Sequence, residues 1–491
     1  MDASMNEKKP VIMLVIDTLM DEPLQAAIRS GRAPALKFLI EKGQYYPKVV
    51  TAFPTMSVTI DTTILTGTYC DHHHLPGLVW FQQQENRLIN YGTHFRELWK
   101  LGLGQAVEDL LFQLNEHHIS DKVETIHETL DKNGADSASI NALIYRGNTM
   151  HFYHFPKLFT WLSPIQNKKP IMAAKNFSYG SLSKFNPSNR YQHFWQKFGF
   201  NNRSAITELI YLIKNNRLPL FTFAYLPDLD KRVHKYGRMD VKGVEIVDQQ
   251  LQKLFDTYPS WEEALSKNIW ITLGDNGQAH VVSARAHAQI DLQKLLLPYK
   301  IMKLSKGVQK EDQIVLAVND RMAYIYSIDT NKLPEEEIAR WLQTDNRIDV
   351  IAWKNAGVIK VRSGIQEGEL IFQRNGTYVD QYEQSWSING NVSLLDLHLQ
   401  NNRIEYCTYP DALARLHSSL HSHEGNFLVV SAKPGHEFIG EASPSHVGGA
   451  GHGALHEQDS NVPMIINGTS SCPETLRMVD LKKWILSLLD I

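Results

Sequence analysis

The chain has 491 residues, 43% of them hydrophobic, which is enough to bury a large core in more than one lobe. Its 50 Lys and Arg residues nearly balance 53 Asp and Glu residues, so no basic stripe indicates binding to a nucleic-acid duplex. No apolar run reaches the ~18 residues of a membrane span, and Cys70, Cys407 and Cys472 are too far apart for a disulfide framework, so we expect a cytoplasmic protein without membrane attachment. The oligomeric state stays open.

Short apolar runs alternate with helical patterns along the chain. The strand-like runs are Val11–Ile16, Ala138–Tyr145, Leu220–Leu226, Ile269–Leu273, Phe427–Ser431 and Pro463–Ile466. They are apolar throughout, which is typical of parallel strands covered on both faces. Helical spacing appears at Lys122–Lys132, Ala205–Asn215, Val244–Phe255 and the C-terminus. The pattern predicts an α/β fold with a mostly parallel sheet and helices on both faces.

The pattern of strand-like and helical segments changes between about Val282 and His423. Four strand-like segments lie between charged turns there, with one helical segment, PEEEIARWLQ, among them. After this region the apolar strand of Phe427–Ser431 resumes the first pattern. We therefore expect a catalytic core at residues 1–281 and 424–491, interrupted by a smaller α+β cap lobe at residues 282–423. A lobe inserted between segments of the core can cover a site and select its substrates.

Metal-ligand residue types gather where the apolar strands end. Asp17 follows the first strand, Asp230 and His234 follow the third, Asp275 follows the fourth, and His436 and His452 come after the strand Phe427–Ser431. We expect these four strand ends to meet at one edge of the core sheet. Ligands of open α/β sheets bind at the carboxyl ends of strands. Any one of these aspartates alone fits a helix cap. Several buried carboxylates together cost several kcal/mol per ion, and a pair of divalent metals would compensate for this cost.

The motifs in this order resemble the alkaline phosphatase superfamily, in particular its type I phosphodiesterase/nucleotide pyrophosphatase branch. The resemblance places a metal-binding Asp at Asp17 and the nucleophile at Ser57 in FPTMSVTIDTTILTG. It places an Asp-x-x-x-His-x-x-Gly motif at Asp230, His234 and Gly237. Its Asp-His-Gly falls on Asp275-Asn276-Gly277, and its late His-Gly falls on His452-Gly453.

Two positions differ from this family pattern. Asn276 stands where the family has a second histidine ligand, and Ile60 stands where many members place an asparagine near the phosphoryl group. Three outcomes are open at Asn276: a harder metal such as Mn or Mg, a nearby histidine that fills the place, or weakened catalysis. His280 is the nearest histidine in the sequence.

The resemblance implies an alkaline phosphatase-like fold and a metal-dependent phosphoric ester hydrolase: a phosphodiesterase/nucleotide pyrophosphatase or a phosphatase. Ser57 would carry the phosphoryl or nucleotidyl group of a small phosphorylated substrate. Two divalent ions are implied, one held by Asp17, Asp275, Ser57 and Asn276 and the other by Asp230, His234 and His452. Mixed His and carboxylate ligands favour zinc, with manganese as the alternative.

Two further residues are candidates for contact with the substrate. Asp61 lies one helical turn after Ser57, and Trp80 belongs to the aromatic segment that follows. Packing in the core is the alternative for Trp80. The alternative function is a degenerate family member that binds a phosphorylated ligand without efficient hydrolysis, and a phosphonoacetate hydrolase-like or mutase-like activity is a further one. No Gly-x-Ser-x-Gly elbow supports a serine hydrolase of another type.

Overall fold

The computed structural model describes residues 8–92, 95–155 and 169–491, and its core is a seven-stranded sheet in the order β2-β24-β10-β1-β9-β5-β8. The strands are β1 (Val11–Ile16), β2 (Gln44–Val50), β5 (Ser137–Ile140), β8 (Asn176–Ser178), β9 (Phe221–Leu226), β10 (Ile269–Gly274) and β24 (Asn461–Asn467). β1 pairs in parallel with both β9 and β10, whereas β24 runs antiparallel to β10 and β2. The predicted α/β fold with a mostly parallel sheet is confirmed.

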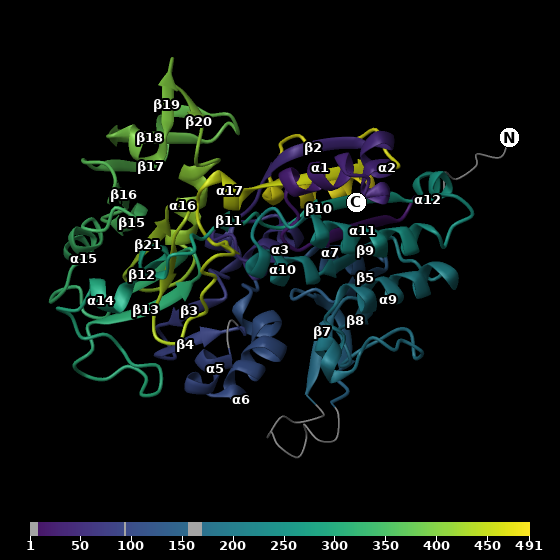
Figure 1. Cartoon of the computed structure of the whole chain (residues 1–491), viewed down its shortest axis with the longest axis horizontal. Helices are drawn as coiled ribbons and strands as arrows, with labels where there is room; N and C mark the ends of the chain where they lie inside the picture. The colour runs from purple at the N-terminus through teal and green to yellow at the C-terminus, as the bar shows by residue number, and fades with distance from the viewer. Residues whose placement is uncertain (1–7, 93–94, 156–168) are drawn as a thin grey trace.

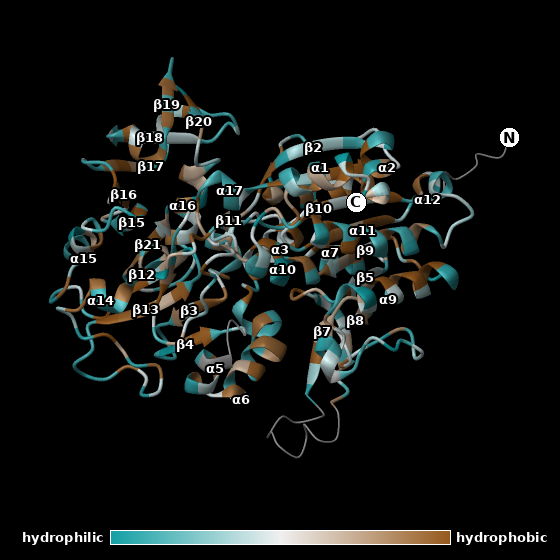
Figure 2. Cartoon of the chain, in the orientation of Figure 1, coloured by the Kyte–Doolittle hydropathy of each residue, from teal (hydrophilic) through white to brown (hydrophobic). Residues whose placement is uncertain are grey.

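Both faces of this sheet are covered. Val11, Met13 and Val15 of β1 belong to one buried cluster, and the alternating Ile12, Leu14 and Ile16 belong to another. The first face is covered by α3 (Ser57–Thr66), α7 (Ile126–Lys132) and α18 (Leu481–Leu488). The second is covered by α1 (Asp21–Arg29), α2 (Pro34–Lys42), α9 (Asn202–Lys214), α11 (Val241–Phe255) and α12 (Trp261–Lys267). The inner strands β1, β9 and β10 are buried along their whole length, whereas the edge strand β2 is partly exposed and is coloured teal and white in Figure 2.

Two predicted boundaries move for local reasons. The helix expected from Lys122 begins at Ile126, because Thr125 and Glu128 form a capping box that starts it there. The strand expected to reach Tyr145 ends at Ile140, because Asn141 adopts a positive φ of 55°. Hydrophobic spacing shows neither effect.

A second, nine-stranded sheet forms the other half of the molecule, at the left of Figure 1. Its strands are β13 (Ile314–Asn319), β14 (Met322–Ser327), β15 (Ile348–Asn355), β16 (Val358–Arg362), β17 (Leu370–Asp380), β18 (Ser385–Gly390), β19 (Leu397–Gln400), β20 (Arg403–Tyr406) and β21 (Phe427–Ala432). One face packs against α14 (Leu292–Leu295) and α15 (Glu335–Leu342). The other shares a buried cluster with the core sheet, so the two halves are continuous in the interior.

The strand β21 corrects one expectation. We assigned its segment to the core sheet, but it lies between β14 and β15 in the second sheet and is antiparallel to both. An apolar strand covered on both faces has the same sequence pattern in either sheet, so the pattern could not assign it. The division into residues 1–281 with 424–491 and residues 282–423 stays a prediction.

Short elements connect the two sheets. Two-stranded pairs are formed by β3 (Val79–Gln82) with β4 (Arg87–Asn90), β6 (Arg146–Phe152) with β7 (Pro170–Ala173), β11 (Ala279–His280) with β23 (Ala450–Gly451), and β12 (Gln289–Asp291) with β22 (Glu437–Ile439). The helices among these elements are α4 (Cys70–His73), α5 (Phe95–Leu101), α6 (Leu103–Glu108), a π-helix at Asp109–His118, α10 (Asp228–Tyr236), α13 (Arg285–Ala288), α16 (Ala412–Leu420) and α17 (Glu457–Ser460). None of the helices in the described ranges is both long and apolar enough to cross a membrane.

Candidate active site

Three adjacent parallel strands deliver the acidic residues of the site. β1 is followed by Asp17, β9 leads into α10 with Asp230 and His234, and β10 is followed by Asp275. Because β9, β1 and β10 are neighbours with the same direction, these ends meet at one edge of the sheet. The predicted convergence of these strand ends is therefore present.

Ser57 is the first residue of α3 and lies against Asp275. Its Oγ donates a hydrogen bond of 2.8 Å to Asp275 Oδ2. The other oxygen, Asp275 Oδ1, accepts from the backbone N–H of Thr18 at 2.9 Å and of Asn276 at 2.8 Å. Asp275 is thus fixed by the backbone on one side and presents its second oxygen to the serine.

Asp230, His234 and His452 form a compact group of possible metal ligands. Their ligand atoms all lie within 4.8 Å of one another. Nε2 of His234 is 3.1 Å, and Nε2 of His452 is 3.7 Å, from Asp230 Oδ1. Their Nδ1 atoms lie 2.8 Å from the carbonyl oxygen of Ala450 and 2.6 Å from that of Thr55. Since a carbonyl only accepts, each Nδ1 donates, which turns Nε2 toward the site.

His452 reaches this group by a route that differs from the expected one. We expected a fourth strand end of the core sheet to bring it, but the strand before it, β21, lies in the second sheet. His452 instead lies directly after β23, which pairs with β11. His436 lies elsewhere, with its Nδ1 2.8 Å from the carbonyl oxygen of His287.

Burial and mutual repulsion shift the protonation of these carboxyls. Burial, with the charges of Asp275 and Asp230, raises the pKa of Asp17 well above its usual value. Burial also raises the pKa of Asp275. For Asp230 burial acts in the same direction, but the adjacent His234 and His452 outweigh it and lower its pKa. For His234 burial opposes the charge of Asp230, which prevails and raises the pKa to about 9.

The donor set fits divalent cations. Two imidazoles and one carboxylate suit zinc at Asp230, His234 and His452. Asp17 and Asp275 are buried, and within the described residues neither forms an ion pair with Lys or Arg. A cation would supply the missing positive charge beside these two carboxylates.

Asn276 is wholly buried next to this acidic pair. Its Oδ1 accepts a hydrogen bond of 3.0 Å from Thr18 Oγ1, whereas its Nδ2 has no hydrogen-bond partner. His280 does not take the place of a ligand, because it is exposed and its Nδ1 lies 3.1 Å from the carbonyl oxygen of Gly449. In the described part of the chain, no set of three Asp, Glu, His or Cys ligand atoms within 4.8 Å of one another includes Asp17 or Asp275.

Sequence reasoning missed three polar residues that hydrogen-bond to the aspartates of the site. Thr18 has a positive φ of 63°, and its Oγ1 lies 3.1 Å from Asp230 Oδ1 and 3.3 Å from Asp17 Oδ1. Gln278 Nε2 donates to Asp230 Oδ1 at 2.7 Å and to Thr18 Oγ1 at 3.1 Å. The hydroxyl of Tyr225 donates to Asp275 Oδ2 at 3.3 Å. Each lies within six residues of an expected ligand along the chain, which was the available signal.

A cavity of about 450 Å³ opens onto these groups. Asp17, Ser57, Asp230, His234 and His452 all line it. The second half of the molecule contributes Asp320, Pro444 and His446, and apolar or aromatic side chains complete the wall: Leu78, Leu110, Leu111, Leu143, Tyr179 and Phe200. Among the described residues that line it there is no Lys or Arg. The cavity therefore joins a potential metal site to a mainly apolar wall.

Asp61 and Trp80, the candidate substrate contacts, are buried and are not among the residues that line this cavity. Neither carboxylate oxygen of Asp61 has a hydrogen-bond partner. Burial, followed by the charge of Asp275, raises the pKa of Asp61 well above its usual value. Trp80 Nε1 donates to the hydroxyl of Tyr91 at 3.4 Å. Contact of either residue with a substrate stays a prediction.

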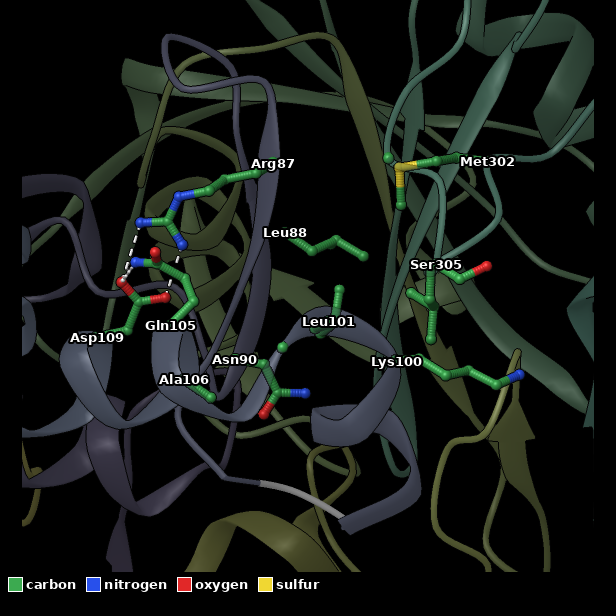
Figure 3. A pocket seen from close by; sticks show the side chains of 13 residues that line it. Arg87, Leu88, Asn90, Lys100, Leu101, Gln105, Ala106, Asp109, Met302 and Ser305 are labelled. Carbon is green, nitrogen blue, oxygen red and sulfur yellow. Dashed lines mark hydrogen bonds and ion pairs between the residues drawn. The ribbon is translucent and has the colours of Figure 1, made fainter. Parts of the chain in front are cut away.

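A second cavity, of about 240 Å³, lies beside α5 and α6 (Figure 3). Its one carboxylate, Asp109, faces Arg87, whose Nη1 donates at 2.6 Å and Nη2 at 2.9 Å. No histidine is among the described residues that line it. The carboxylate is neutralised by Arg87, and Lys100, which also lines the cavity, is paired with Glu441, so this cavity does not repeat the carboxylate and histidine group of the first one.

Comparison with known proteins agrees with this geometry. The family described as type I phosphodiesterase / nucleotide pyrophosphatase matches residues 11–391. The fold is similar to murine ectonucleotide pyrophosphatase/phosphodiesterase 5, with a TM-score of 0.57 and 13% identity over 98% of this chain and 95% of that one. It is also similar to phosphonoacetate hydrolase from Sinorhizobium meliloti 1021 in complex with phosphonoacetate, with a TM-score of 0.58 and 15% identity over 98% of this chain and 96% of that one.

A search of curated proteins gave no match. The identities to the solved structures are low, so these structures support the fold, whereas the family match covers most of the chain. The chain belongs to the type I phosphodiesterase/nucleotide pyrophosphatase family of the alkaline phosphatase superfamily, whose members are hydrolases acting on phosphoric esters.

Proposed function

We propose that the chain hydrolyses small phosphoric esters through a covalent intermediate on Ser57. The observation that carries this proposal is the 2.8 Å hydrogen bond from Ser57 Oγ to Asp275 Oδ2 in the cavity that Asp230, His234 and His452 also line. A free serine hydroxyl is a weak nucleophile and needs a partner that takes its proton. Asp275 is in place for this role.

The first half of the reaction forms the phospho-enzyme. Ser57 Oγ attacks phosphorus, its proton passes to Asp275 Oδ2, and the bond from phosphorus to the leaving oxygen breaks. The leaving oxygen takes a proton from solvent and departs as an alcohol. Ser57 is at the N-terminus of α3, where unpaired N–H groups and the helix dipole favour an anionic phosphoryl group.

The second half restores the enzyme. Water attacks phosphorus, the bond to Ser57 Oγ breaks, and Ser57 recovers the proton held by Asp275. The proton lost by water goes to solvent and balances the one taken by the leaving oxygen.

Two divalent cations complete the site in this proposal. One would be held by Asp230, His234 and His452, and the other by Asp17, Asp275, Ser57 and Asn276. When bound, such ions act as Lewis acids that offset the charge of the phosphoryl, attacking and leaving oxygens. The chain's own residues hold the ligand atoms in place: the Nδ1 atoms of His234 and His452 donate to backbone carbonyl oxygens, and these bonds fix the orientation of both imidazole rings.

The wall of the cavity favours a nucleotide-like ester. Tyr179 and Phe200 pack edge to face with ring centroids 4.6 Å apart, and they lie among leucines in the cavity lining. A flat base can pack on such a wall. The murine relative has been solved as an inactive variant in complex with AMP. In contrast, the wall offers no Lys or Arg among its described residues for the extra carboxylate of phosphonoacetate.

Replacement of Ser57 tests the nucleophile. Ser57→Ala should lower kcat for p-nitrophenyl esters of phosphate and of nucleoside monophosphates by at least about a thousandfold, because it removes the hydroxyl that lies 2.8 Å from Asp275 Oδ2. Ser57→Thr keeps a hydroxyl and should retain measurable turnover, which makes it the matched control. Unchanged turnover by Ser57→Ala would refute the assignment.

Binding without hydrolysis is the competing function, and Asn276 is the residue that favours it. Its test is wild-type turnover: if AMP binds in calorimetry but no ester is hydrolysed with Zn²⁺, Mn²⁺ or Mg²⁺, the chain is a binding protein.

A further inference from the structure

The two potential metal positions offer different donor atoms. Asp230, His234 and His452 combine one carboxylate with two imidazole nitrogens. At the other position, Ser57 is hydrogen-bonded to Asp275, Asp17 lines the cavity together with Ser57, and Asn276 directly follows Asp275. These side chains offer carboxylate, hydroxyl and amide groups and no imidazole. Imidazole suits zinc, whereas carboxylate, carbonyl and hydroxyl oxygens suit magnesium and manganese.

Asn276 belongs to the second group by position. Its backbone N–H donates to Asp275 Oδ1 at 2.8 Å, and its Oδ1 accepts at 3.0 Å from Thr18 Oγ1, a hydroxyl that lies between the two groups, 3.3 Å from Asp17 Oδ1 and 3.1 Å from Asp230 Oδ1. Its side chain is fully buried, and its Nδ2 is an unpartnered polar atom in this acidic surrounding. A buried polar group without a partner costs about 1–3 kcal/mol, so this amide is poorly satisfied by the protein alone.

A further carboxyl group lies behind this position. Asp61 follows Ser57 by four residues in α3, which places both side chains on the same side of the helix. It is fully buried, neither of its oxygens has a hydrogen-bond partner, and it lies within electrostatic range of Asp275. The second position is therefore surrounded by carboxyl groups and has no imidazole among its ligands, which suits a hard cation that prefers oxygen.

We propose that the two positions take different cations: zinc at Asp230, His234 and His452, and manganese or magnesium at Asp17, Asp275, Ser57 and Asn276. This inference rests on the proposed function, which supplies the two metal positions, and it adds which metal each position prefers. Zinc binds most nitrogen and oxygen sites more tightly than manganese does. The inference is therefore that the preference for zinc over manganese is larger at the imidazole-containing position than at the oxygen position. Zinc fills the imidazole-containing position first, and the oxygen position is left for the harder ion.

Anomalous scattering tests this directly. The metal-free chain is given one equivalent of Zn²⁺ and an excess of Mn²⁺, crystallised, and measured at the absorption edges of both metals. The expected maps show zinc beside His234 and His452 and manganese beside Ser57. Zinc beside Ser57, or zinc divided equally between the two positions, would overturn the inference.

A single substitution should change the selectivity. Asn276→His adds an imidazole to the oxygen position, so zinc should then divide between both positions and displace manganese. Asn331→His, at an exposed turn after β14, adds a histidine outside the site and should leave the wild-type distribution unchanged. Paramagnetic resonance of bound Mn²⁺ follows the same change in solution when two equivalents of Zn²⁺ are given with the excess of Mn²⁺: the signal of about one Mn²⁺ per chain should be lost in Asn276→His and kept in Asn331→His.

The two proposals fail differently. If Asn276→His does not fold, the wild-type maps still decide the inference. If zinc occupies both positions of a wild-type chain that hydrolyses esters through Ser57, only the selectivity is wrong. If Ser57→Ala remains active, the proposed function is wrong, whatever metals are found.

Discussion

Phe200 lies in the cavity lining, where its ring meets Tyr179 edge to face at 80°. Loss of a base-stacking aromatic ring costs about 1–3 kcal/mol, so Phe200→Ala should raise KM for a nucleotide ester roughly tenfold. Hydrolysis of glycerol phosphate, which has no ring to stack, should keep its KM and so serves as the matched substrate. Equal losses for both substrates would show that Phe200 supports the fold of the site and does not select the base.

Asp349 lies in β15, and its pH behaviour can be separated from the site. Burial raises its pKa to about 6, although Tyr409 donates a 3.0 Å hydrogen bond to Oδ2. The folded chain therefore binds this proton more tightly than the unfolded chain, so stability falls as the pH rises from about 4 to about 6. Asp349→Asn should remove this loss and raise the free energy of unfolding at pH 7.5 by at most about 3 kcal/mol. Urea unfolding of both proteins at pH 5 and pH 7.5 measures it, and an unchanged difference between the two pH values would contradict the prediction.

The turn between β13 and β14 is anchored by Arg321, which is fully buried together with its partner Asp459. Nε of Arg321 donates to Asp459 Oδ1 at 3.0 Å, and its other nitrogens donate to carbonyl oxygens of residues 432, 433 and 436. Asp459 lies in α17, immediately before β24 of the core sheet. This ion pair therefore ties an element of the second sheet to the core.

Removal of this guanidinium should destabilise the whole chain. Arg321→Met leaves a buried carboxylate unpaired and should lower the free energy of unfolding by about 3–5 kcal/mol. The double variant Arg321→Met with Asp459→Leu removes both charges and should recover part of the loss. Urea denaturation of the four proteins in this cycle gives the coupling, and additive losses would contradict the pairing.

Individual elements show what the sequence pattern can predict and what it cannot. β1, β9 and β10 were predictable because buried parallel strands are apolar throughout, and their polar ends marked the site. β21 was assigned to the wrong sheet because an apolar run does not show which strands it pairs with. The residues Asp17, Ser57, Asp230, His234 and His452 were predicted and line one cavity, and Asp275 accepts a hydrogen bond from Ser57.

At the scale of the whole molecule, the docking of the two sheets completes the cavity. Asp320 comes from the β13–β14 turn and His446 from the segment after β22, and both line the cavity with Ser57. The ring of His446 stacks on that of His234 with centroids 4.0 Å apart. Neither residue was predicted, because their proximity to the core depends on how one half packs on the other, and local spacing does not encode that contact.

A cavity between the two halves is lined by Ser57 and the potential metal ligands, and Asp275, the proposed proton acceptor, contacts this serine. In the proposed reaction, Ser57 becomes covalently phosphorylated or nucleotidylated during turnover. The most direct measurement is acid quenching of the metal-loaded enzyme during hydrolysis of a nucleotide ester, followed by mass spectrometry of its peptides. We predict the added mass of one phosphoryl or nucleotidyl group on Ser57, absent from Ser57→Ala. Steady turnover with a modified residue other than Ser57 would contradict the account.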